Sequence, residues 1–178
     1  MVPPGTTWRN PRTGATLTVV EDTPARAVIE RRMAPHTGRT DPHVHRDFDQ
    51  EWEVLDGEMR CTIAGEDLRL RAGDRAAVRR GTPHRDAWND ADDDLVVRLT
   101  IEPSSRFIEV FARTLGGLME RDAVNAQGEF TQLQLFAVLR AGRADSWAPG
   151  IPVAVQKPVV VLGAALARVR GHRAVTGP

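Results

Sequence analysis

Residues 41–45 of this chain read DPHVH, so His43 and His45 stand two positions apart. Alternate side chains of an extended strand point to the same face, and the pattern therefore predicts two imidazoles side by side. A third histidine, His84, ends the later stretch GTPH. Imidazole is a common ligand for transition metals, and three imidazoles can hold one ion while leaving coordination positions open. The sequence thus predicts a metal site made by these three histidines.

Strand-like segments and turn glycines recur at regular places in the sequence around the histidines. After the His-x-His pair, a strand ends at a turn glycine, and a later strand between two glycines precedes the third histidine. In chain order these residues are His43, His45, Gly57, Gly73, Gly81 and His84. Over residues 38–102 the pattern resembles the two motifs of the cupin superfamily. The resemblance implies a mainly β fold, a cupin (jelly-roll) β-barrel, with one metal ion held by the histidines.

The chain departs from the first motif at the position of its usual glutamate, which falls on Gln50. A shift of one residue would bring Glu51 there, but it would turn every side chain of the strand to the other face. With Gln50 inward, both neighbouring glutamates face away, which avoids burying unpaired carboxylates. We therefore expect Gln50 to be the fourth metal ligand or to hydrogen-bond a metal-bound water. Glu51, and Asp47 and Asp49 in the preceding loop, remain alternatives.

Three more residues are candidates for the site. Trp52 follows Gln50 on the same face of its strand, and Trp88 has the parity of His84, so both are expected to line a substrate pocket. The second motif usually has asparagine where this chain has Trp88. Asp86 also shares the parity of His84 and is the catalytic candidate, because it can orient a ligand histidine or take a proton.

These features predict a mononuclear metalloenzyme. A neutral fourth ligand leaves the charge of a divalent ion uncompensated, which favours a small substrate with its own oxyanion, such as a phenol, an enol or a polyketide. The ion is expected to be iron, zinc, manganese, nickel or copper. Oxygenase chemistry is the leading expectation; a redox-silent zinc cyclase or isomerase, as in the cupin polyketide cyclases, and a non-catalytic binding protein are the alternatives.

The composition of the chain argues against some classes of binding partner. Lys plus Arg and Asp plus Glu number 24 each, so bulk charge recruits neither nucleic acid nor an anionic membrane. No apolar run reaches the length of a membrane-spanning helix. The single cysteine, Cys61, and the absence of a secretion signal at the N-terminus together predict a cytoplasmic protein. Cys61 itself is expected to be a buried thiol.

After Pro103 the residue pattern changes from one that is typical of strands to one that is typical of helices. Residues 1–103 are expected to form the barrel, and residues 104–178 a helical extension that packs on the barrel or at a dimer interface. Helices are predicted over residues 106–121 and 130–139, and a third is predicted to open at Pro158 and run to residue 167. The extension exceeds what barrel closure needs, and a homodimer is therefore expected.

Overall fold

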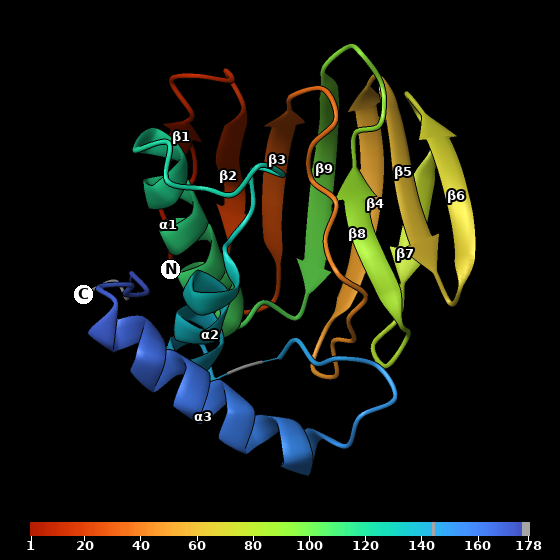
Figure 1. Ribbon diagram of the computed structural model, residues 1–178. Coiled ribbons are helices and arrows are strands. Elements are labelled where there is room, and N and C mark those ends of the chain that lie inside the picture. The colour runs from red at the N-terminus through yellow and green to blue at the C-terminus, as the bar shows by residue number, and fades with distance from the viewer. Residues whose placement is uncertain (144, 176–178) are drawn as a thin grey trace.

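The computed structural model describes residues 1–143 and 145–175, which form nine strands followed by three helices (Figure 1). The helices are α1 (Arg106–Glu120), α2 (Gln132–Ala141) and α3 (Val153–Val169). The strands are β1 (Thr7–Arg9), β2 (Thr16–Asp22), β3 (Ala27–Met33), β4 (Asp49–Asp56), β5 (Glu58–Ile63), β6 (Glu66–Arg71), β7 (Arg75–Val78), β8 (His84–Trp88) and β9 (Leu95–Glu102).

The strands form two antiparallel sheets. Six strands make the larger sheet in the order β1-β2-β3-β9-β4-β7, and three make the smaller sheet in the order β6-β5-β8. Figure 1 shows the smaller sheet standing beside and in front of the β9–β4 part of the larger one. Buried side chains from both sheets belong to one hydrophobic core. This is the mainly β barrel that the sequence predicts, with the helices following it.

Strand β4 shows how the residue pattern produces the barrel interior. Its residues alternate between buried and partly exposed, and the buried ones are Gln50, Trp52 and Val54. The glutamates between them point outward, where Glu53 contacts the guanidinium groups of Arg75 at 2.8 Å and Arg98 at 3.2 Å. The predicted register of this strand is therefore confirmed, and no unpaired glutamate is buried there.

The segment that carries the first two histidines is not the strand expected from the sequence. Between β3 and β4 the chain is irregular, and it makes only isolated bridges, one between His43 and His84 and one between Val44 and Trp147. Pro42 lacks the N–H that a continuing ladder would need. The two bridges and a hydrogen bond from the Gly81 N–H to the His45 carbonyl at 2.6 Å hold the segment, and the rings of His43 and His45 lie together.

The helices gather beside the β1–β3 end of the larger sheet (Figure 1). Helix α1 lies where it is predicted, but α2 begins two residues later than expected, because Thr131 caps it. The Thr131 hydroxyl accepts from the Gln134 N–H, and the Gln134 side chain accepts from the Thr131 N–H. Such a reciprocal cap satisfies two N–H groups at once and marks where a helix starts.

The prediction that Pro158 opens the third helix is wrong. Helix α3 begins at Val153 and contains Pro158 in its interior. A proline inside a helix costs about 3 kcal/mol. Packing on both sides of it offsets this cost, since Val153 and Val160 both contact the core and Gly163 faces the ring of Phe136 on α2.

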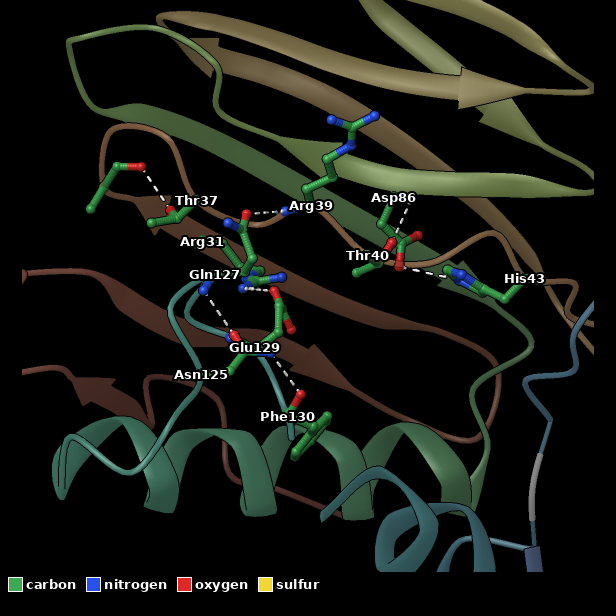
Figure 2. Close-up of polar contacts among 11 residues, drawn as sticks. Arg31, Thr37, Arg39, Thr40, His43, Asp86, Asn125, Gln127, Glu129 and Phe130 are labelled. Atoms are coloured by element: carbon green, nitrogen blue, oxygen red, sulfur yellow. Dashed lines mark hydrogen bonds and ion pairs between the residues drawn. The ribbon is translucent and has the colours of Figure 1, made fainter. Parts of the chain in front are cut away.

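The loop between α1 and α2 inserts a charged side chain into the interior. Glu129 accepts a hydrogen bond from the Arg31 guanidinium of β3 at 2.5 Å, and both side chains are no more than 10% exposed. Figure 2 shows this pair beneath the segment that runs from Thr37 to His43. Asn125 holds the loop, because its side-chain oxygen accepts from the N–H groups of Gln127 and Glu129. The helical region is thus joined to the barrel through a buried ion pair.

Candidate metal centre

Three imidazoles converge at one end of the barrel interior. His43 and His45 come from the β3–β4 segment, and His84 is the first residue of β8. The ring centroids lie 4.9 Å apart for His43 and His45, 4.4 Å for His43 and His84, and 5.2 Å for His45 and His84. One nitrogen from each ring lies within 4.8 Å of the others. The cluster can therefore bind one metal ion.

Each ring is held by its Nδ1 atom. In all three cases Nδ1 contacts a backbone carbonyl oxygen, which can only accept a hydrogen bond, so Nδ1 must carry the proton. The contacts are His43 to Asp41 at 2.9 Å, His84 to Thr82 at 2.9 Å, and His45 to Asp145. The neutral tautomer that results presents the Nε2 lone pair to the centre of the cluster. This is how proteins orient imidazoles that bind a metal.

Two buried polar atoms of the cluster, His84 Nε2 and Asp86 Oδ1, lie 3.6 Å apart and have no hydrogen-bond partner among the described residues. Gln50 Oε1 and Trp52 Nε1, on the buried face of β4, have none either. Buried polar atoms are nearly always satisfied, and a group of unsatisfied ones at a single place indicates that an ion and its water ligands complete the site. The residues therefore fit a bound metal ion. His43, His45 and His84 would hold it.

Charges at the centre are strongly coupled. Burial lowers the pKa of His45 to about 3, with a further contribution from His43, so this ring is neutral near pH 7. Burial also lowers the pKa of His43, but the neighbouring carboxylate of Asp86 outweighs burial and leaves that pKa raised. Burial raises the pKa of Asp86, and the two histidines beside it reverse the effect and hold its pKa well below the ordinary value.

The structure places the four candidates for the fourth ligand differently. Gln50 points its side chain inward, whereas Glu51 pairs with Arg75 on the outer face of the barrel at 3.3 Å. Asp49 also lies outside the cluster, because its carboxylate accepts from the backbone N–H and the side chain of Arg80. Asp47 is exposed. Of these four residues, Gln50 alone turns its side chain into the barrel.

Both predicted pocket tryptophans are buried. Trp52 is 2% exposed and belongs to the core, and Trp88 is 7% exposed with the Arg39 guanidinium 5.5 Å above its ring. The aromatic side chain nearest a ligand ring belongs instead to Phe48, which stacks on His45 at 4.3 Å. Phe107 of α1 continues this stack. The sequence-based reasoning missed both phenylalanines.

It also missed a segment from the far end of the chain. Asp145 lies between α2 and α3; its carbonyl oxygen fixes His45, and its carboxylate accepts from the N–H groups of Arg46 and Asp47. Trp147 pairs with Val44 next to the same histidine. The chain beyond the barrel therefore helps to shape the site. No local pattern around residues 145–147 could have shown this.

Comparisons with known proteins agree with the fold. Residues 30–102 match the model of the cupin domain. No curated protein matches the chain in sequence. Among solved structures, an uncharacterized double-stranded β-helix protein from Klebsiella pneumoniae is 26% identical, with a TM-score of 0.43 over 49% of this chain and 75% of that one.

Two further structures are similar to this chain. KdgF from Halomonas is 26% identical, with a TM-score of 0.45 over 55% of this chain and 86% of that one. A predicted oxalate decarboxylase from Thermotoga maritima is 20% identical, with a TM-score of 0.47 over 58% of this chain and all of that one. With the match of residues 30–102 to the cupin domain, the two antiparallel sheets are those of a cupin double-stranded β-helix, and three helices follow them. Across the described part of the chain, none of the helices has both the length and the apolar character to cross a membrane.

Proposed function

We propose that this protein is a mononuclear metal-dependent enzyme that acts on a small substrate with an oxyanion, such as a phenol, an enol or a polyketide-like compound. One observation carries the proposal: three imidazoles, each fixed through Nδ1 to a backbone carbonyl, bring one ring nitrogen each to within 4.8 Å of the others. A structural role alone would not require three rings, each held by a backbone carbonyl, to bring their free nitrogens together.

The surroundings explain why the substrate should be anionic. Three neutral imidazoles add no negative charge, and the single carboxylate of Asp86 beside them leaves a divalent ion with a net positive charge, so the ion attracts an anionic oxygen as a further ligand. When bound, the ion would act as a Lewis acid toward that oxygen. The buried rings of His45 and His84 keep water from one side of the site. Access is left on the side of His43 and Asp86, whose side chains are 13% and 20% exposed.

The ion decides between the two reaction types. Iron, manganese, nickel or copper would support oxygen-dependent chemistry on the bound substrate, which is our first proposal. The alternative is a redox-silent zinc cyclase or isomerase. It is favoured by the same donor set, because three histidines with an open fourth position form a well-known catalytic zinc site. A third possibility is a protein that binds a small molecule without turnover, in which the ion would hold that molecule in place.

Metal analysis and oxygen uptake together separate these functions. We expect mass spectrometry of the purified full chain to find one transition ion per chain, and an oxygen electrode to record uptake with at least one member of a panel of phenols and enols. Stoichiometric zinc without oxygen uptake, but with conversion of an enol substrate, would replace the oxygenase by the cyclase or isomerase. A bound ion with no turnover of any panel member would leave a binding protein.

We also propose a homodimer formed through α3. Six large apolar side chains on this helix are 48–81% exposed. Val161 is one of them, and the other five are separated alternately by four and three residues: Val155, Val159, Leu162, Leu166 and Val169. This spacing is that of a coiled-coil seam, which a second copy of the same helix can cover. Light scattering should give the mass of a dimer, and Leu162→Glu should give a monomer with unchanged circular dichroism. A monomeric wild type would refute this assembly.

A further inference from the structure

Asp86 lies on β8, two residues after His84, and turns its carboxylate toward the metal side of the histidine cluster. We propose that Asp86 is the fourth protein ligand of the ion, and that it supplies the carboxylate that Gln50 lacks at the motif position. The proposal rests on the three-histidine site proposed above. It differs from the sequence-based expectation, in which Gln50 binds the ion and Asp86 orients a histidine or transfers a proton.

The hydrogen bonds of the rings determine which side Asp86 faces. Every Nδ1 of the three histidines already donates to a backbone carbonyl. Asp86 instead approaches two Nε2 atoms, with Oδ2 at 3.3 Å from that of His43 and Oδ1 at 3.6 Å from that of His84 (Figure 2 shows the first contact). An ion bound to these Nε2 atoms would have the Asp86 carboxylate beside it, and no ring N–H would remain for Asp86 to orient.

The distances are close to those between neighbouring ligands of one ion. Zinc ligands lie about 2.0–2.2 Å from the metal, so two ligands at a right angle are separated by roughly 3 Å. The observed separations of 3.3 and 3.6 Å need only a small contraction to reach that value. Asp86 is therefore placed for direct coordination.

The charge balance points the same way. Asp86 Oδ1 is buried and has no hydrogen-bond partner among the described residues. A buried carboxylate is costly unless a cation is next to it. The nearest groups to this carboxylate are the Nε2 atoms of His43 and His84, at 3.3 and 3.6 Å. A cation bound to these Nε2 atoms would lie next to the carboxylate and balance its charge.

An irregularity in the small sheet aims the side chain. The pairing of β8 with β5 shifts between Arg60 and Thr62, so that Asp86 and Ala87 together lie opposite one residue of β5. Bulges of this kind redirect side chains and are frequent next to active sites. The Asp86 N–H donates to the Thr40 hydroxyl at 3.3 Å, which links the bulge to the segment carrying His43.

The assignment refines the substrate class. A divalent ion with three neutral imidazoles and one carboxylate has a net charge of one, so a singly charged anion would make the complex neutral. The inward Gln50, whose Oε1 atom has no partner among the described residues, would then accept from a water bound to the ion. A monoanionic phenolate or enolate fits this balance better than a dianion.

A thiolate introduced at either rival position tests the inference without any assay of activity. In the full chain loaded with Co²⁺, the Asp86→Cys variant should show an intense thiolate-to-cobalt charge-transfer band, and the Gln50→Cys variant should not. Wild type, which already contains the buried Cys61, sets the baseline. Titration with Co²⁺ alone gives a second readout: Asp86→Asn should weaken affinity by more than about 100-fold, beyond what outer partners contribute. Gln50→Ala should change it by less than about 10-fold.

Two results would overturn the assignment. One is a charge-transfer band in Gln50→Cys but not in Asp86→Cys. The other is a Co²⁺ affinity of Asp86→Asn equal to that of wild type. If wild type itself takes up no Co²⁺ while it remains folded, the proposed histidine site fails, and the ligand role of Asp86 fails with it. The wild-type titration therefore separates failure of the site from failure of this assignment alone.

Discussion

Replacing His45 by alanine is expected to lower the affinity for Co²⁺ or Zn²⁺ by more than about 100-fold, so that the purified variant contains almost no metal. The reason is that His45 is one of the three proposed ligands and its ring is firmly held. Its ring is 5% exposed, stacks on Phe48 and is fixed by the carbonyl of Asp145. Loss of a partner outside the ligand set already costs 10–100-fold in affinity, and loss of a ligand should cost more.

The matched control is His172→Ala, which removes a histidine that lies beyond α3 and outside the cluster. Its metal content should equal that of wild type. Because His45→Ala also leaves a gap beside Phe48, thermal unfolding of both variants in the presence of a chelator has to accompany the metal analysis. A folded His45→Ala protein with a full complement of metal would show that this ring is not a ligand.

Replacing Glu129 by alanine is expected to destabilise the fold by about 3–5 kcal/mol, because it leaves the buried guanidinium of Arg31 without its partner. Burial raises the pKa of Glu129 in spite of the nearby arginine, so the pair is costly to bury even when it is intact. Replacing both partners by apolar residues, in Arg31→Met with Glu129→Leu, should therefore recover most of the lost stability. Denaturant unfolding of the three proteins measures these differences.

Glu51→Ala is the control for this second experiment. It removes a carboxylate from an exposed ion pair with Arg75, in which the side chains are 46% and 59% exposed. Exposed pairs contribute little, and the change should stay within about 1 kcal/mol. If Glu129→Ala is as mild as Glu51→Ala, the buried pair does not hold the α1–α2 loop on the barrel.

The parts of the fold that depend on neighbours in sequence could be predicted. The alternation along β4 placed Gln50 and Trp52 inside, because the period of a strand determines its faces. The motif glycine Gly57 has a φ of 83°, and a Cβ there would lie 2.7 Å from the carbonyl oxygen of Asp94. A turn that requires glycine is visible in a sequence, since other residues rarely adopt this conformation.

The parts that depend on distant residues could not be predicted. The carbonyl that orients His45 belongs to a residue 100 positions away in the sequence. Any residue type could supply a backbone carbonyl, so no side-chain pattern predicts it. The partner of Arg31 is 98 residues away in a loop. Pro158 misled the prediction of α3 because local preference was outweighed by packing on α2. The sequence predicted a division between barrel and helical extension at residue 103. Residues on both sides of that position build the site, so the division does not separate the site from the extension.

X-ray absorption at the K-edge of the ion bound to the full chain tests the central claim most directly. Scattering from outer imidazole atoms reports how many histidines bind the ion, independently of any substrate. The account predicts three imidazole nitrogens together with oxygen ligands that include one carboxylate. A spectrum of a stoichiometrically bound ion without imidazole scattering, or with a single imidazole, would contradict it.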